Sequence, residues 1–252
     1  MAFLCLIIAT TPKMKINLNE IELQRYHRNI LLPELGEEGQ LKLKSAKVLV
    51  VGAGGLGSSV CMHLVAAGVG RVGIMDHDVV EISNLQRQLL YSHPDLGESK
   101  ALKACEKLAD QNPFVEVVAY DFKMTDENAS KLISEYDLII GALDNSATRY
   151  LIDSVCQQMG KPYIHGAVSQ FDGQLGVFNY KGSPSYRALF PDPPINDFER
   201  IQDKGILSPV AGTVGSLQAL EALKIILHVG DVLAGRLLIV DFLKMRFTTM
   251  QF

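Results

Sequence analysis

The chain has 252 residues, of which 48% are hydrophobic and 21% charged, and its mean hydropathy is +0.14. These values exclude a disordered or fibrous protein and are typical of a globular chain that buries one large core or two small ones. The formal net charge of −4 gives no overall positive field, so we expect neither nucleic acid nor a membrane as a partner.

The N-terminal segment, residues 1–16, carries no motif. Its apolar run over residues 3–9 is far shorter than the roughly 20 residues of a membrane span, and the lysines follow that run instead of preceding it as in a secretory signal. We expect residues 1–16 to be an extension without function, with Met14 as the natural start.

The four cysteines, Cys5, Cys61, Cys105 and Cys156, form no C-x-x-C pair. This spacing indicates neither a disulfide framework nor a cysteine zinc site. A reducing compartment, the cytoplasm, is the expected location.

Helical and strand patterns alternate through the first two thirds of the chain. A helical arm over residues 17–45 breaks at Leu32-Pro33. Strands are then predicted over 47–51, 71–75, 115–120, 138–142 and 162–167, and helices over 58–67, 99–109 and 147–159. Apolar strands that alternate with helices predict an α/β, Rossmann-like fold with a mostly parallel sheet.

The pattern changes after residue 168. Strands over 174–180 and 237–242 and a helix over 214–228 are separated by a polar segment, 181–203, with prolines at 184, 191, 193 and 194. We predict no regular element in that segment and expect it to cross the active site. The sequence thus predicts a single domain over 17–252, in which residues 169–252 extend the sheet with mixed or antiparallel strands.

A glycine-rich turn follows the first predicted strand. Gly52, Gly54 and Gly57 satisfy G-x-G-x-x-G between that strand and a helix, and Asp76 ends the next strand. Such a turn lets phosphates approach main-chain N–H groups, and the acidic residue can accept hydrogen bonds from a ribose. These features predict a nucleotide site.

Downstream residues indicate which nucleotide. Arg87 and Lys100 suit a triphosphate better than a nicotinamide, and the carboxylate of Asp144 ends the fourth predicted strand, where it can hold Mg²⁺. An NAD-dependent oxidoreductase stays the alternative. An oxidoreductase should be stabilised against heating by NAD, whereas a protein that binds a triphosphate should be stabilised by ATP with Mg²⁺.

Several spaced motifs together resemble the ubiquitin-activating-type family of ThiF, MoeB and HesA adenylyltransferases over about residues 23–247. In chain order they are Arg25-Tyr26-His27-Arg28, Leu31 to Gly36, the glycine turn, Asp76-His77-Asp78, Ser83 to Gln88, Gly97 to Lys100, Leu143-Asp144-Asn145 and Gly215 to Glu221. His27 and His77, beside these motifs, and His165 have no spaced partners and are given no role.

The resemblance implies ATP-dependent adenylation of the C-terminal glycine of a ubiquitin-like sulfur carrier of ThiS or MoaD type, followed by transfer from a sulfur-donor protein. It implies an ATP-binding half over 46–168, a carrier-binding half over 169–252 with a crossover loop over 181–208, and a homodimer in which Arg28 reaches the partner's phosphates. The implied catalytic residues are Arg28, Arg87, Lys100 and Asp144, with Asp144 at the metal. The implied nucleotide ligands are Gly52, Gly54, Gly55, Gly57, Asp76, Asp78, Ser83, Asn84, Gln86, Arg87, Lys100, Asp144 and Asn145.

Two positions depart from the family pattern. Ser185-Tyr186-Arg187-Ala188 replaces a zinc-binding C-x-x-C, and the chain ends at Phe252 without a second pair, so we expect no zinc. Ile201 stands where some members have a cysteine that bonds to the carrier. Isoleucine is no nucleophile, which puts a covalent step in question and leaves adenylation intact.

The sequence leaves two further alternative functions. A dehydratase that activates a carboxylate on a modified tRNA base would need a strongly basic surface, which a net charge of −4 does not supply. A silent scaffold would not need the four implied catalytic residues. The sequence leaves open the choice between thiamine and molybdopterin synthesis, the sulfur donor and the role of a crossover loop without its cysteine.

Overall fold

A computed structural model describes residues 17–192 and 205–252; the predictions for residues 1–16 and for Ile201 lie outside these residues. Within them the strands form one eight-stranded sheet in the order β3-β2-β1-β4-β5-β6-β7-β8. The strands are β1 (Lys47–Val51), β2 (Arg71–Met75), β3 (Glu116–Tyr120), β4 (Leu138–Gly141), β5 (Tyr163–Ser169), β6 (Asp172–Phe178), β7 (Arg236–Asp241) and β8 (Arg246–Gln251).

The sheet is parallel from β3 to β5 and antiparallel from β5 to β8. Its central strands are almost continuous runs of buried apolar side chains, because helices cover both faces. The predicted Rossmann-like fold with an antiparallel extension is therefore confirmed.

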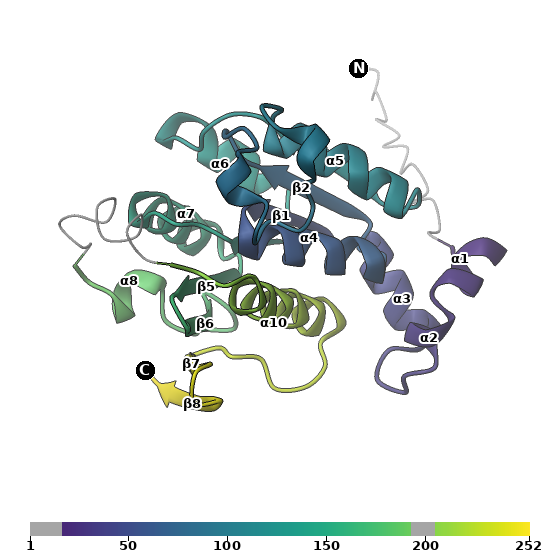
Figure 1. Cartoon of the computed structure of the whole chain (residues 1–252). Coiled ribbons are helices and arrows are strands. Elements are labelled where there is room, and N and C mark those ends of the chain that lie inside the picture. The colour runs from purple at the N-terminus through teal and green to yellow at the C-terminus, as the bar shows by residue number, and fades with distance from the viewer. Residues whose placement is uncertain (1–16, 193–204) are drawn as a thin grey trace, which may run out of the picture.

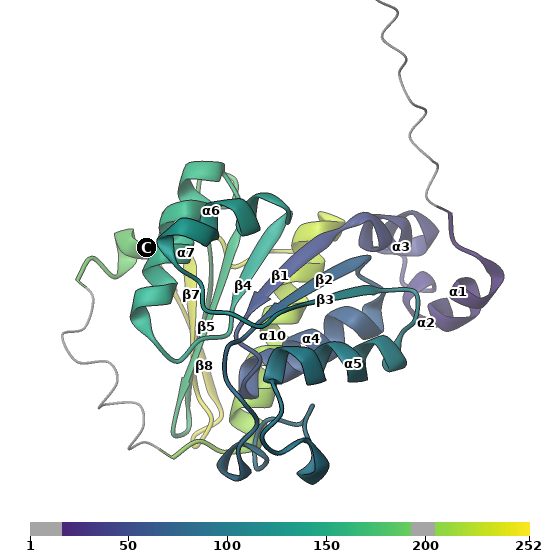
Figure 2. The same ribbon diagram turned by 90° about the horizontal axis from the view of Figure 1, so that it is seen from above.

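The helices form two layers (Figures 1 and 2). α4 (Gly55–Ala67), α5 (Lys100–Gln111) and α10 (Ser208–Leu227) pack on one face, and α6 (Asp126–Ser134) and α7 (Ser146–Met159) pack on the other. α10 is long and apolar enough for a membrane span, but it packs against α4 and β5 and 56% of its apolar window is buried. It is a core helix of this fold.

The N-terminal arm consists of three helices, α1 (Glu20–Arg25), α2 (His27–Ile30) and α3 (Gly36–Ser45), with the predicted break at Leu32-Pro33 between the last two. The Tyr26 ring packs on Gly68, and the Tyr26 hydroxyl accepts a hydrogen bond of 2.8 Å from the amide of Asn112. Because α3 leads directly into β1, the arm lies at the amino ends of the strands, the right side of Figure 1.

Several elements differ from the prediction. The segment predicted to contain no regular element holds a short helix, α8 (Tyr186–Leu189), and that part of the prediction was wrong. Ser185 accepts a hydrogen bond from the main-chain N–H of Ala188, and the buried carboxylate of Asp153 accepts from the N–H groups of Tyr186 and Arg187. A distant carboxylate thus stabilises the first turn of α8.

The sequence also gave no prediction for α6 or β8, or for the single turns η1 (Ile82–Asn84) and η2 (His93–Asp95). α10 begins at Ser208, six residues before the predicted start, because Pro209 is accommodated in its first turn. β6 likewise begins and ends two residues earlier than predicted.

Candidate functional site

The glycine turn links β1 to α4 and leaves no room for a side chain at Gly52 or Gly57. Gly52 has φ +99°, and a Cβ placed on it would lie 2.3 Å from the carbonyl oxygen of Ala142. A Cβ on Gly57 would lie 1.9 Å from the carbonyl oxygen of Gly52. Gly54 is the N-cap of α4 and has no side chain to occupy the N–H groups of the first turn. These groups are therefore available to an anionic ligand.

Asp76 braces this turn from the end of β2. Its Oδ2 accepts a hydrogen bond of 2.7 Å from the Ala53 N–H, and its Oδ1 accepts one of 2.9 Å from the Asp78 N–H. Burial raises the pKa of Asp76, and the two main-chain hydrogen bonds oppose this shift. Each oxygen keeps a second lone pair, so the predicted contact with a ribose is compatible with this arrangement.

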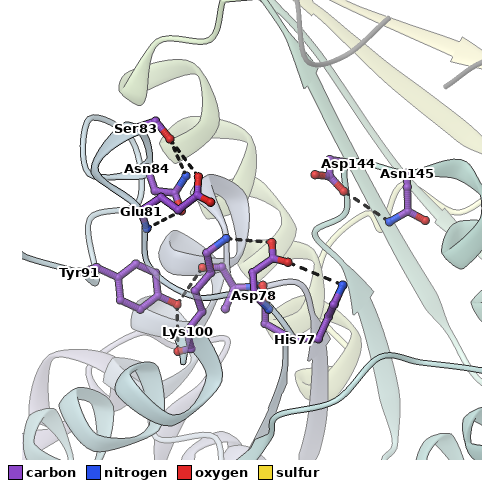
Figure 3. Close-up of polar contacts among 11 residues, drawn as sticks. His77, Asp78, Glu81, Ser83, Asn84, Tyr91, Lys100, Asp144 and Asn145 are labelled. Carbon is purple, nitrogen blue, oxygen red and sulfur yellow. Dashed lines mark hydrogen bonds and ion pairs between the residues drawn. The ribbon is translucent and has the colours of Figure 1, made fainter. Parts of the chain in front are cut away.

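Lys100 is the first residue of α5 and only 6% exposed. Its Nζ lies 3.1 Å from Oδ2 of Asp78, and its main-chain N–H donates to the Asp78 carbonyl (Figure 3). The Tyr91 hydroxyl lies 3.0 Å from the Ala53 carbonyl oxygen and 3.1 Å from that of Lys100. Tyr91, which the sequence did not single out, therefore joins the glycine turn to α5.

The loop over residues 81–88 carries the predicted phosphate ligands. Asn84 is buried, and its side chain accepts from the Glu81 N–H and lies 3.4 Å from the Ser83 hydroxyl. Nη1 of Arg87 donates to the Ser83 carbonyl at 3.0 Å. These bonds give the loop a defined conformation before any ligand binds.

Two glutamines of the same loop behave differently. The amide of Gln86 donates to the Ile206 carbonyl at 3.3 Å, outside the glycine turn. Gln88 is 4% exposed and lies against Gly54, and its Oε1 has no partner among the described residues. Gln88 therefore packs against the turn as a buried polar residue, and its amide nitrogen is the atom nearest Gly54.

Asp144 and Asn145 follow β4 at the neighbouring position of the same sheet edge. Asn145 caps α7 by accepting from the Thr148 N–H at 3.0 Å, and its amide lies 3.4 Å from Oδ1 of Asp144. Arg149 donates a hydrogen bond of 2.6 Å to the Leu143 carbonyl, which holds the turn after β4 in place. Asp144 itself is exposed, and Figure 3 shows it, with Asn145, apart from the group formed by His77, Asp78 and Lys100.

Three acidic or imidazole side chains, Asp76, His77 and Asp78, bring their ligand atoms within 4.8 Å of one another. Both oxygens of Asp76 accept main-chain hydrogen bonds, whereas Oδ2 of Asp78 pairs with Lys100 and its Oδ1 lies 3.7 Å from Nε2 of His77. The carboxylates of Asp78 and Asp144 are exposed whereas that of Asp76 is partly buried, so the first two are the more accessible oxygen ligands for Mg²⁺ at this edge.

Arg28 is the predicted site residue that one chain does not bring to this edge. It is an exposed residue of α2, which follows Tyr26 and so lies near Gly68, at the amino end of the sheet. α4 spans the distance between Gly68 and the glycine turn. One chain therefore does not bring Arg28 to the glycine turn, and the role predicted for this residue would need a second copy of the chain.

A family model and two relatives match nearly the whole chain. The model of the ThiF family matches residues 26–252. The sulfur carrier protein adenylyltransferase of Thermus thermophilus is 49% identical over 232 residues, which cover 90% of this chain and 86% of that protein. The adenylyltransferase and sulfurtransferase MOCS3 of Anopheles gambiae is 47% identical over 225 residues, 89% of this chain and 51% of that protein. The chain thus spans about half the length of this relative.

Solved structures show the same fold at low identity. Escherichia coli MccB in a crystal structure with ATP has a TM-score of 0.79 and 23% identity, over 92% of this chain and 72% of that chain. PaaA has a TM-score of 0.80 and 22% identity, over 96% of this chain and 77% of that chain. The family match over nearly the whole described chain, the close relative and the shared fold agree, and the chain belongs to the ThiF family.

Proposed function

We propose that the chain catalyses ATP-dependent adenylation of the C-terminal glycine of a small ubiquitin-like sulfur carrier of ThiS or MoaD type. A carboxylate oxygen of the carrier attacks the α-phosphorus of ATP, the bond from that phosphorus to the bridging oxygen breaks, and pyrophosphate leaves. The names of the Thermus thermophilus and Anopheles gambiae relatives, both adenylyltransferases, support this activity.

The observation that carries the proposal is the nearly buried cation of Lys100 beside the glycine turn, with Asp144 after β4 at the same edge of the sheet. The reaction brings an anionic nucleophile to a polyanion, so its barrier is lowered mainly by positioning and by fixed positive charge. Lys100 and Arg87 supply that charge, and the N–H groups at the start of α4 hold phosphate oxygens. This set has no evident use in hydride transfer.

The remaining roles follow from placement. Asp76 binds the ribose, and Asn84 holds the phosphates with Arg87. Asp144 and Asp78 would hold Mg²⁺, which when bound neutralises phosphate charge. Arg28 enters from the second subunit of a homodimer. The ATP-binding half is residues 46–168.

We place the carrier on the half formed by residues 169–252. A cavity of about 660 Å³ lies there between the β5–β6 turn, the segment before α10 and the β7–β8 turn. Three of its lining residues, Phe171, Leu207 and Leu243, expose large apolar side chains. An apolar protein surface can cover these side chains while its C-terminal tail runs toward Asp144.

The carrier adenylate then reacts with a separate sulfur-donor protein in the cytoplasm, where ATP is available. No zinc takes part in this scheme. The sequence at the position of the family's first cysteine pair supports that expectation, because Ser185, Tyr186, Arg187 and Ala188 offer neither a thiolate nor an imidazole.

The test is exchange of labelled pyrophosphate into ATP by the full chain, with purified ThiS-type and MoaD-type carriers added separately. We expect exchange with one carrier, none with the same carrier lacking its C-terminal glycine, and loss of exchange in Asp144→Asn. ATP with Mg²⁺ should raise the melting temperature, whereas NAD should not. Exchange with neither carrier, or stabilisation by NAD alone, would refute the proposal.

A further inference from the structure

The segment immediately before α10 is held from two sides. On one side, the Gly205 carbonyl accepts a hydrogen bond of 3.0 Å from the N–H of Gln170, and Ile206 pairs with Gln170 in an isolated parallel bridge. On the other side, the Ile206 carbonyl accepts the hydrogen bond from the amide of Gln86. Residues 205–207 are thus fixed between the β5–β6 turn and the loop over 81–88.

The same three residues form one wall of the 660 Å³ cavity, whose other walls are residues 170–172 and part of 241–244. Leu207 is both the N-cap of α10 and 50% exposed. A displacement of this segment therefore changes the shape of the cavity.

Gln86, the donor of the hydrogen bond to Ile206, belongs to the loop over residues 81–88, here called the nucleotide loop. The N–H groups of Arg87 and Gln88 both donate to the Asn84 carbonyl at 3.0 Å, which makes residues 84–88 a compact turn. A shift in the main chain at Gln86 is therefore transmitted to Arg87, its direct neighbour and a proposed phosphate ligand. The side chain of Gln86 is exposed, and its amide donates to the Ile206 carbonyl.

We propose that Gln86 is a positioning residue that couples the nucleotide loop to the cavity wall formed by residues 205–207, so that ATP and the carrier bind cooperatively. The carrier's place in the cavity rests on the proposed function; the contact between the two segments does not. One neutral hydrogen bond of this kind corresponds to a coupling of about threefold to tenfold in affinity.

The first test needs no carrier. Hydrogen exchange of the segment over residues 205–213 is compared in the wild type, Gln86→Leu and the control Gln157→Leu, which makes the same change at an exposed position of α7. Without nucleotide, we expect this segment to exchange faster in Gln86→Leu than in the wild type and the control. ATP with Mg²⁺ should slow the exchange in the wild type and the control but not in Gln86→Leu. Equal protection of the segment in all three proteins would overturn the proposal.

The second test separates positioning from direct nucleotide binding. In Gln86→Leu we expect the KM of the carrier in pyrophosphate exchange to rise about threefold to tenfold, and we expect the carrier to lose the effect on the Kd of ATP that it has in the wild type. A Kd of ATP weakened by the same factor with and without carrier would make Gln86 a nucleotide ligand only and would overturn the inference. If the wild type exchanges with neither carrier, the proposed function fails, while hydrogen exchange still decides the role of Gln86.

Discussion

Lys100→Met gives the sharpest prediction for the proposed site, because activity and stability should respond very differently. The lysine is 6% exposed and lies at the first position of α5, and its Nζ is 3.1 Å from the Asp78 carboxylate. Methionine keeps most of the stem that packs in this place and removes the charge. The substitution therefore tests the cation alone.

The expected changes in stability and in activity follow from the environment of Lys100. The Asp78 side chain is 55% exposed, so the ion pair contributes only about 0–1 kcal/mol to folding. A cation in the first turn of a helix is unfavourable by roughly 0.3–1 kcal/mol, which offsets that contribution. The free energy of unfolding should therefore change by less than about 1 kcal/mol. Removing a fixed charge from the transition state costs about 2.7–4 kcal/mol, a rate loss of about 10²–10³.

Pyrophosphate exchange at saturating ATP, Mg²⁺ and carrier measures the activity, and urea unfolding measures the free energy of unfolding. Lys103→Met is the matched control, because Lys103 is on the same helix and pairs with exposed Glu106 at 2.8 Å. We expect the control to keep wild-type activity and stability. An exchange rate in Lys100→Met above one tenth of the wild type would refute the assigned role, and so would a loss of more than about 3 kcal/mol of stability.

Three further predictions concern the dimer, the arm and the metal content. Arg28→Ala and Arg87→Ala should each lose exchange, and mixing them should restore part of it, because a hybrid dimer then has one complete site; no recovery despite demonstrated subunit exchange would contradict this. Gly68→Ala should lower the free energy of unfolding by about 2–4 kcal/mol in urea titrations, because Gly68 has φ +83° and a Cβ would lie 2.5 Å from the Tyr26 ring. Protein purified without chelators should contain well under one zinc per chain by elemental analysis, and a stoichiometric value would contradict the expectation.

The parts of the fold that the sequence predicted are those with a local signal. Strand β1 is a run of β-branched and apolar residues, and the glycine turn after it must adopt a conformation that other residues avoid. β8 was missed because all six of its residues are exposed, so that no alternation of buried and exposed residues marks it. α8 was missed because its first turn depends on Asp153, more than thirty residues earlier in the chain.

The same distinction applies to the site. Motif positions identified the residues at the sheet edge, but a motif does not state which atom each side chain contacts. Tyr91 and Arg149 were not found because their partners, the carbonyls of Ala53, Lys100 and Leu143, are main-chain atoms with no residue-specific pattern. Gln86 lies within a motif, yet its partner is the Ile206 carbonyl, which only the folded chain brings near.

The described cysteines support the prediction that adenylation proceeds without a covalent bond between enzyme and carrier. Cys61 and Cys156 are fully buried, and Cys105 is partly buried on α5. Burial raises the pKa of all three thiols. The thiolate is the nucleophile, so raised pKa values keep these groups protonated and unreactive near neutral pH.

The direction of the shift makes this prediction testable over a range of pH. An unfolded cysteine has a pKa of about 8.5, so its alkylation accelerates between pH 7 and 9, whereas Cys61 and Cys156 of the folded chain should stay unlabelled throughout. Enzyme, carrier, ATP and Mg²⁺ incubated together should then give, by intact mass without reductant, a carrier heavier by AMP alone. AMP is a good leaving group, so a sulfur donor can attack this adenylate directly and no enzyme thiol is required. A reductant-sensitive enzyme–carrier adduct that disappears when Cys61, Cys105 or Cys156 is replaced by alanine would show that a buried thiol becomes exposed during the reaction, and the prediction would be wrong.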